Sequence, residues 1–228
     1  MRLGVLFSGG KDSTLALHIA AEKEAVACLI TVVSKNPESY MFHTPNIDLT
    51  ELQAEALELP LVSMATEGQK EAELADLERA IARAKSQFGI EGVVTGAVES
   101  VYQSTRVQRI CSRLDVWCFN PLWKLNQKAL LETLVAQCFR VIISGVFAYP
   151  LDERWLGKQI DTQMIAWLVE LQGKYGIGIS PSGEGGEIET TVLDAPMFKE
   201  RIEILDSAVE AKGNSGTYLV KQARLVPK

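Results

Sequence analysis

The sequence has no long hydrophobic run, no closely paired cysteines and no excess of positive charge. Its apolar stretches all fall short of the roughly 18 residues that a membrane-spanning helix needs, and the apolar start is too short for a signal peptide. The four cysteines form no CxxC pair, which favours reduced thiols over disulfides or metal ligands. The net charge of −6 disfavours general binding to nucleic acid or to an anionic membrane. We therefore expect a cytoplasmic protein without nucleic-acid or membrane partners.

Short β-rich runs alternate with longer helical stretches over the first two thirds of the chain. Strands are expected at residues 3–7, 25–33, 61–64, 92–96, 116–119 and 141–146, with helices at 12–22, 49–59, 70–88, 103–114 and 127–138. This alternation implies right-handed βαβ crossovers and a parallel sheet that is covered on both faces. It predicts an α/β, doubly wound domain over residues 1–147, and we expect Trp117, Trp123 and Trp167 to be core residues.

The pattern changes in the remaining residues, 148–228. A helix is expected at 158–174, followed by a glycine-rich stretch and by three segments typical of antiparallel strands, at 188–193, 198–209 and 217–225. This predicts a smaller C-terminal α+β lobe that binds the substrate. We also consider a homodimer formed through this lobe.

The segment Ser8-Gly9-Gly10-Lys11-Asp12-Ser13 lies between the first expected strand and helix. Glycines allow a sharp turn and let a phosphate approach the backbone N–H groups. The following helix start adds further donors and the positive end of its dipole. Lys11 adds a positive charge, and Asp12 can hold a Mg²⁺ ion that bridges phosphate oxygens. A plain strand-to-helix turn capped by Asp12 or Ser13 is the alternative.

Two familiar nucleotide-binding motifs are absent from this segment. It is not a Walker A loop, which disfavours γ-phosphate chemistry, and it lacks GxGxxG, which disfavours a dinucleotide cofactor. SGGxDS instead resembles the signature of the N-type ATP pyrophosphatases, or PP-loop enzymes. That resemblance implies cleavage of ATP between the α and β phosphates to activate a carboxylate or carbonyl oxygen.

Three glutamates form a second candidate feature, in Gly183-Glu184-Gly185-Gly186-Glu187-Ile188-Glu189. If Glu187 begins a strand, Glu187 and Glu189 lie on one face. Three close carboxylates repel one another unless a cation is present, so a metal or a cationic substrate group is implied. A solvated acidic loop is the alternative.

Nearly the whole chain resembles the diphthine–ammonia ligases (diphthamide synthetases), a PP-loop family. The resemblance is carried by residues 8–13, 38–44, 96–106, 151–157 and 183–196. It departs from the family at Ile188, usually aromatic, and at Thr191, usually aliphatic. The resemblance implies an adenine nucleotide α-hydrolase-like (HUP) fold and, as co-substrate and cofactor, ATP and Mg²⁺. It also implies adenylation of the diphthine carboxylate on elongation factor 2, followed by displacement of AMP by ammonia.

These considerations yield a set of expected site residues. ATP binding is expected at Ser8, Gly9, Gly10, Lys11, Asp12, Ser13 and Gly96. Catalytic roles are expected for Lys11, Asp12, Glu187 and Glu189, with Asp12 as the metal ligand. Substrate binding is expected at His43, Thr44, Glu99, Tyr102, Arg106, Trp155, Glu184, Gly185, Gly186, Glu187 and Glu189.

Three other functions are consistent with parts of the sequence. A PP-loop ligase or amidase could act on another small carboxylate. Thiolation of tRNA is disfavoured, because it needs catalytic cysteines and a basic surface. A non-catalytic nucleotide-binding regulator, similar to universal stress proteins, would bind ATP without releasing pyrophosphate.

Overall fold

The computed structural model describes residues 1–36, 45–69, 72–175 and 179–228. The chain folds as two compact units, Met1–Trp123 and Lys124–Lys228. The expected residues His43 and Thr44 lie outside the described part of the chain.

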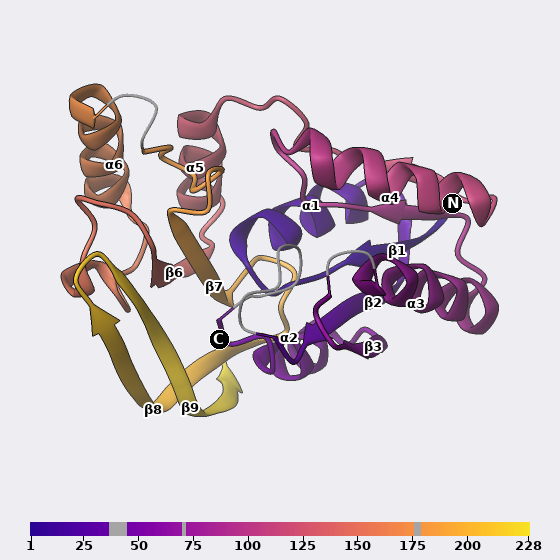
Figure 1. The fold of residues 1–228 in the computed structure, drawn as a ribbon. Coiled ribbons are helices and arrows are strands. Elements are labelled where there is room, and N and C mark those ends of the chain that lie inside the picture. Colours follow the sequence, from indigo (N-terminus) through magenta and orange to yellow (C-terminus); the bar gives the residue numbers. More distant parts are fainter. Residues whose placement is uncertain (37–44, 70–71, 176–178) are drawn as a thin grey trace. The chain divides into compact units, whose positions relative to one another are not determined.

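Unit 1 is built on a parallel sheet (Figure 1). It contains β1 (Arg2–Leu6), α1 (Lys11–Ala21), β2 (Ala25–Ser34), α2 (Leu49–Leu57), β3 (Leu61–Thr66), α3 (Ala72–Phe88), β4 (Gly92–Val94), α4 (Val101–Arg113) and β5 (Trp117–Phe119). The strand order is β3-β2-β1-β4-β5, and every neighbouring pair is parallel. The chain moves outward from β1 to β3, returns to β4 and then continues to β5. Right-handed crossovers then place α1 and α2 on one face and α3 and α4 on the other. This confirms the expected doubly wound α/β fold.

One hydrophobic cluster fixes the face that α3 and α4 cover. Cys28, Ile30 and Val32 alternate along β2 and pack with buried side chains of α3 and α4, including Ile81 and Ile110. Alternation on a strand sends i and i+2 residues to the same face. Alternate residues of β2 therefore pack against α3 and α4 on one face of the sheet, and the residues between them point to the opposite face.

Unit 2 contains an antiparallel sheet. Its elements are α5 (Gln127–Ala136), β6 (Arg140–Val146), the short 3₁₀ helix η1 (Glu153–Trp155), α6 (Thr162–Tyr175), β7 (Ile188–Asp194), β8 (Glu200–Lys212) and β9 (Ser215–Pro227). The strand order is β7-β6-β9-β8, with antiparallel pairing throughout. Strands β8 and β9 form a long hairpin through the turn at Gly213.

The expected position of residues 141–146 as the last strand of the parallel sheet is wrong. β6 pairs with β7 and β9, because the apolar run that fills it suits a buried antiparallel strand equally well. The two compact units consequently divide between Trp123 and Lys124, which differs from the expected boundary after residue 147.

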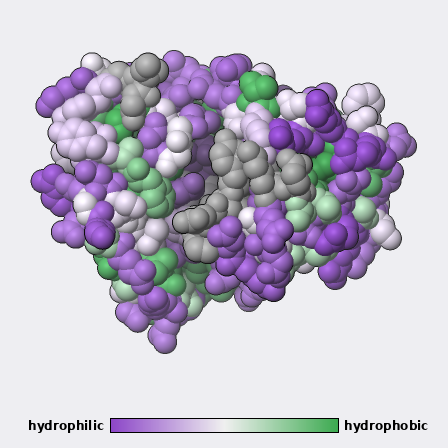
Figure 2. Space-filling view, in the orientation of Figure 1, coloured by the Kyte–Doolittle hydropathy of each residue, from purple (hydrophilic) through white to green (hydrophobic). Residues whose placement is uncertain are grey.

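The three tryptophans expected in the core are also placed differently. Trp117 is 68% exposed on the edge strand β5, and Trp123 and Trp167 are exposed as well. The face drawn in Figure 2 is mostly hydrophilic, with apolar residues in scattered groups. Within the described ranges, no helix is both long enough and apolar enough to cross a membrane. The four cysteines are free thiols.

Candidate functional site

Residues 8–13, here called the nucleotide loop, connect β1 to α1. Gly9 has a φ of +75°, in the left-handed region that favours glycine. Gly10 is the N-cap residue with an extended backbone, and α1 begins at Lys11. The first N–H groups of a helix have no partners within the helix and carry the positive end of its dipole. The loop can therefore bind a phosphate group beyond the carboxyl end of β1.

Hydroxyl groups close the nucleotide loop on itself. The Oγ atoms of Ser8 and Ser13 are 3.2 Å apart, and the Ser8 N–H donates to Ser13 Oγ at 3.3 Å. Ser13 Oγ and Thr14 Oγ1 both donate to the Gly10 carbonyl, at 3.2 and 2.8 Å. These bonds keep the two serine hydroxyls beside the start of α1, where phosphate oxygens would be bound.

Gln53, which the sequence analysis did not identify, supports the same loop from α2. Its side chain is fully buried, and its Nε2 donates to the Gly9 carbonyl at 3.0 Å. A Cβ atom at Gly9 would collide with the Gln53 side-chain amide. The sequence shows Gln53 only as a glutamine beside the apolar residues Ala54, Ala56 and Leu57. Because its partner Gly9 lies 44 positions away, the sequence does not indicate this contact.

Lys11 and Asp12 form an ion pair within the loop. Lys11 is 4% exposed, and its Nζ lies 2.8 Å from Asp12 Oδ2. The other carboxylate oxygen, Oδ1, is buried without a hydrogen-bond partner among the described residues. An unpartnered carboxylate oxygen fits a Mg²⁺ ion, which typically binds one or two protein carboxylates together with substrate phosphates. Over the described parts of the chain, no group of three or more His, Cys, Asp or Glu residues could form an all-protein metal site.

Gly96 follows β4 and lies against the nucleotide loop. β1 and β4 are neighbours in the sheet, and the chain leaves them in opposite directions, which makes their carboxyl ends the switch point where such folds bind ligands. A Cβ atom at Gly96 would lie 2.8 Å from both the Asp12 carbonyl carbon and the Ser13 nitrogen. The structure therefore brings together all seven residues expected to bind ATP.

The start of α4 follows Gly96 directly. Ser100 caps α4 by accepting the Gln103 N–H at 3.3 Å, and Glu99 precedes it in an exposed position. The Arg106 guanidinium lies over the Tyr102 ring, 3.4 Å from its centroid. This cation–π pair joins two of the expected substrate residues one helical turn apart.

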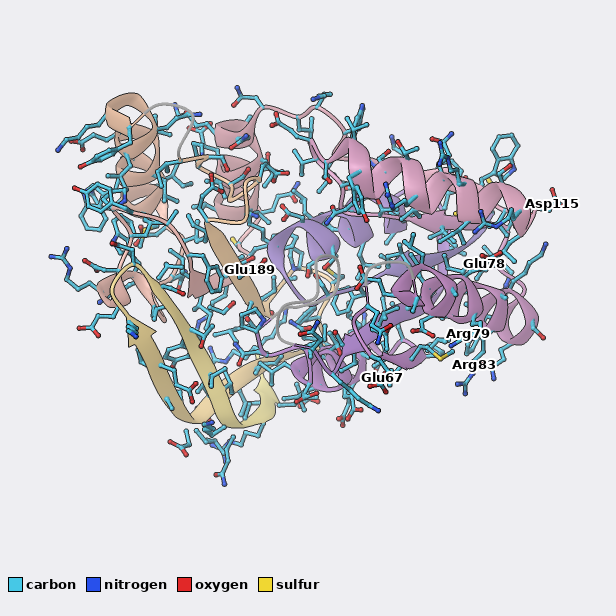
Figure 3. All side chains as sticks on the ribbon, viewed as in Figure 1. Glu67, Glu78, Arg79, Arg83, Asp115 and Glu189 are labelled. Atoms are coloured by element: carbon cyan, nitrogen blue, oxygen red, sulfur yellow. The ribbon has the colours of Figure 1, made fainter. Side chains whose placement is uncertain are left out.

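The glutamates belong to unit 2. Glu187 precedes β7, is 8% exposed and accepts three hydrogen bonds from its own loop. The donors are Ser180 N–H at 3.0 Å, Ser180 Oγ at 3.2 Å and Gly185 N–H at 2.9 Å. Glu184 is half-buried and accepts from Ser182 Oγ at 3.1 Å, whereas Glu189 lies on β7 itself (Figure 3). The carboxylate of Glu187 is thus satisfied without a cation.

The remaining expected residues are placed as follows. Trp155 ends η1 and makes an edge-to-face contact with Trp167, with 6.2 Å between ring centroids. Ile188 and Thr191, where the sequence departs from the family pattern, are both buried in β7. These departures therefore alter packing inside the antiparallel sheet.

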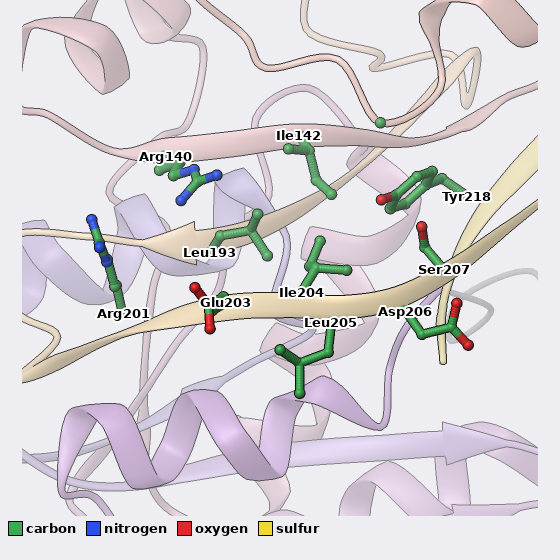
Figure 4. A pocket seen from close by; sticks show the side chains of 11 residues that line it. Arg140, Ile142, Leu193, Arg201, Glu203, Ile204, Leu205, Asp206, Ser207 and Tyr218 are labelled. Atoms are coloured by element: carbon green, nitrogen blue, oxygen red, sulfur yellow. The ribbon is translucent and has the colours of Figure 1, made fainter. Parts of the chain in front are cut away.

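A cavity of about 490 Å³ lies elsewhere in unit 2, between β6, β7 and β8 (Figure 4). Arg140 and Arg201 lie at one end, and Ser207 and Tyr218 lie at the other. None of the expected site residues that the structure describes lines this cavity. Glu184, Glu187 and Glu189 are not among its lining residues.

Family models match both units. A diphthamide synthase N-terminal domain matches residues 1–117, and a diphthamide synthase C-terminal domain matches residues 126–226. The chain belongs to the diphthine–ammonia ligase family. A diphthine–ammonia ligase from Bos taurus and one from Homo sapiens are each 36% identical over 228 residues, covering 91% of this chain and 84% of theirs.

A longer diphthine–ammonia ligase, from Schizosaccharomyces pombe, is 35% identical over 226 residues, covering 92% of this chain and 37% of its own. Among solved structures, a predicted subunit of a tRNA methyltransferase from Methanocaldococcus jannaschii covers 86% of this chain and 97% of its own, with 19% identity. The TM-score of this match is 0.47.

Proposed function

We propose that this chain is an ATP-dependent amide-forming ligase that converts diphthine on elongation factor 2 to diphthamide in the cytoplasm. The observation that carries the proposal is the nucleotide loop at the switch point of unit 1, with Gly96 in close contact with Asp12 and Ser13. Membership of the diphthine–ammonia ligase family supports diphthine as the acceptor. A homodimer formed through residues 148–228 remains a separate prediction.

The reaction has two steps. A carboxylate oxygen of diphthine attacks the α phosphorus of ATP, forming an acyl-adenylate and releasing pyrophosphate. Ammonia then attacks the acyl carbon, AMP leaves with the C–O bonding electrons, and a proton lost from nitrogen completes the amide. Adenylation is needed because a free carboxylate is a poor electrophile.

The nucleotide loop would stabilise the charge that develops in the first step. The N–H groups at the start of α1 and the Lys11 ammonium are donors fixed in place before the reaction. Such preorganised donors stabilise charge on phosphorus oxygens and on departing pyrophosphate. Asp12 Oδ1 would hold Mg²⁺, which when bound neutralises phosphate charge.

The acceptor would be recognised through its charge. Diphthine carries a trimethylammonium group, for which carboxylates and aromatic faces are suitable partners. Within Lys124–Lys228, the candidate receptors are Glu184 and Glu189 with Tyr149 or Trp155. An aromatic face near a desolvated quaternary ammonium contributes on the order of 2 kcal/mol.

The direct test combines the purified chain with ATP, Mg²⁺, isotopically labelled ammonium and diphthine-bearing elongation factor 2. Pyrophosphate release together with label in the protein amide is the expected result. Label in the amide of a small acid instead would favour the alternative function, a PP-loop ligase that acts on another small carboxylate. ATP binding without pyrophosphate from any acceptor would favour a nucleotide-binding regulator, and would sink the proposal.

A further inference from the structure

Residues 180–187, here called the glutamate loop, are organised around one carboxylate. Two successive turns shape the loop, with the Gly183 N–H donating to the Ser180 carbonyl at 3.0 Å and the Gly186 N–H donating to the Gly183 carbonyl at 2.9 Å. Glu187 lies inside these turns and accepts the three bonds from Ser180 and Gly185. A carboxylate has about four acceptor positions. Three of them are therefore used within the loop.

Two glycines of the loop lie where a side chain would collide with Glu187 or with the residue after it. A Cβ atom at Gly185 would lie 2.7 Å from Glu187 Oε1, and one at Gly183 would lie 2.6 Å from the Ile188 carbonyl oxygen. Gly183 also has a φ of +79°. Because these positions have no side chain, the backbone can approach the carboxylate at Gly185 and the Ile188 carbonyl at Gly183.

Ser180 connects the buried glutamate to the half-buried one. Its Oγ accepts the Glu184 N–H at 2.6 Å and donates to Glu187 Oε2 at 3.2 Å. Ser182 Oγ meanwhile donates to Glu184 Oε1 at 3.1 Å. Both the backbone and the carboxylate of Glu184 are therefore held by the loop, and the backbone contact is linked to Glu187 through one hydroxyl.

We propose that Ser180 and Glu187 are positioning residues for amidation, which fix Glu184 and do not themselves contact the substrate. This inference rests on the proposed function, because it assigns separate roles to glutamates expected to bind the cationic acceptor. Glu187 directs its oxygens at loop donors, and Ser180 uses its hydroxyl for two loop bonds. Neither residue then has to change partners when the acceptor arrives.

A double-mutant cycle in the full chain tests this arrangement. Ser180→Ala should lower kcat/KM for the diphthine-bearing protein about fivefold, the effect of one ordinary hydrogen bond. In a Glu184→Gln background the same change should have little further effect, because coupled residues are not additive. Ser215→Ala, at an exposed position of the β8–β9 turn, is the matched control. It should leave kcat/KM unchanged in both the wild-type and the Glu184→Gln backgrounds. Equal losses from Ser180→Ala in both backgrounds would overturn the proposal.

Amide hydrogen exchange gives a second readout that needs no activity. The Glu184 N–H should exchange about fivefold faster in Ser180→Ala, because its acceptor is removed, and should be unchanged in Ser215→Ala. Unchanged exchange in Ser180→Ala would contradict the proposal. If the wild-type chain forms no amide, the proposed function fails, while hydrogen exchange still decides whether Ser180 holds Glu184.

Discussion

Gly96 lies so close to Asp12 that a Cβ atom at Gly96 would come within 2.8 Å of the Asp12 carbonyl carbon. The contact joins the start of α1, which follows β1, to the segment that follows the neighbouring strand β4. Backbone cannot move aside as a flexible side chain can, so the nucleotide loop depends on the absence of a side chain at Gly96.

Gly96→Ala should therefore displace the nucleotide loop. We expect ATP binding to fall by at least about tenfold, corresponding to about 1.4 kcal/mol, as measured by calorimetric titration. The matched control is Gly173→Ala in α6, where an added Cβ atom meets nothing within 4 Å. That control should leave ATP affinity unchanged and stabilise the chain by up to about 1 kcal/mol. If Gly96→Ala binds ATP as tightly as the wild type, the nucleotide loop tolerates the added Cβ atom and the prediction is wrong.

Gln53→Ala should weaken ATP binding indirectly, through its contact with the Gly9 backbone. Loss of the Nε2 donor leaves the Gly9 carbonyl without this partner in a buried position, and a lost hydrogen bond of this kind contributes about 1 kcal/mol. We expect a several-fold rise in the ATP dissociation constant, larger than for Glu55→Ala on the exposed face of the same helix. If the two variants bind ATP equally well, Gln53 does not support the loop.

Asp12→Asn should raise the Mg²⁺ concentration needed for pyrophosphate release. The carboxamide keeps the size of the side chain but removes the negative charge that a hard cation requires. Loss of even an outer-shell partner weakens metal binding by about 10–100-fold, so an effect of at least that size is expected. A Mg²⁺ titration of the rate measures it. An unchanged titration curve would assign the metal to other ligands.

Thiol alkylation should distinguish two of the cysteines. Burial raises the pKa of the Cys28 thiol to about 11, so at pH 8 only about one molecule in a thousand carries the thiolate. Cys138 is exposed and should react first. Peptide mapping after iodoacetamide treatment of the folded chain should find label at Cys138 and not at Cys28. Label at both positions after denaturation is the control, and early label at Cys28 would contradict its buried placement.

Stability should depend on pH through the pair between Glu78 on α3 and Arg113 on α4 (Figure 3 labels Glu78). The hydrogen bonds from Arg113, at 2.6 and 3.0 Å, hold the pKa of Glu78 below its ordinary value. With the folded pKa below the unfolded one, the pair stabilises the chain fully above the unfolded pKa, and the stabilisation is lost as pH falls through the folded pKa.

Glu78→Gln should therefore be slightly less stable than wild type at neutral pH and equally stable in acid below the folded pKa of Glu78. The effect should be small because both side chains are partly exposed. Urea denaturation at the two pH values measures the difference, and Glu55→Gln, at an exposed position of α2, should show none. A difference that persists in acid would exclude the pair as its cause.

The sequence predicted the parallel sheet and the nucleotide loop because both are local patterns. The SGGKDS segment and its flanking strand and helix are contiguous, and Gly96 follows the strand beside it. The sequence could not place β6, since an apolar run such as Val141–Val146 suits either sheet. The exposure of Trp117 depends on β5 being an edge strand, which only the strand order determines.

Supporting residues were missed for a related reason. Gln53 and Ser180 are single polar residues whose partners are brought near by the fold, and neither belongs to a recognisable motif. The glutamates of residues 184–189 were found as a group. Their differences in burial and hydrogen bonding follow from the turns at Gly183 and Gly186, which spacing alone does not determine.

The division between Trp123 and Lys124 has a consequence for how such a chain can diverge. The hydrogen bonds that shape the nucleotide loop lie entirely in one unit, and those that shape the glutamate loop lie entirely in the other. Compact units of this kind can accumulate substitutions independently, provided that each keeps its own core. Substitutions in the glutamate loop could thus accumulate without altering the hydrogen bonds that shape the nucleotide loop.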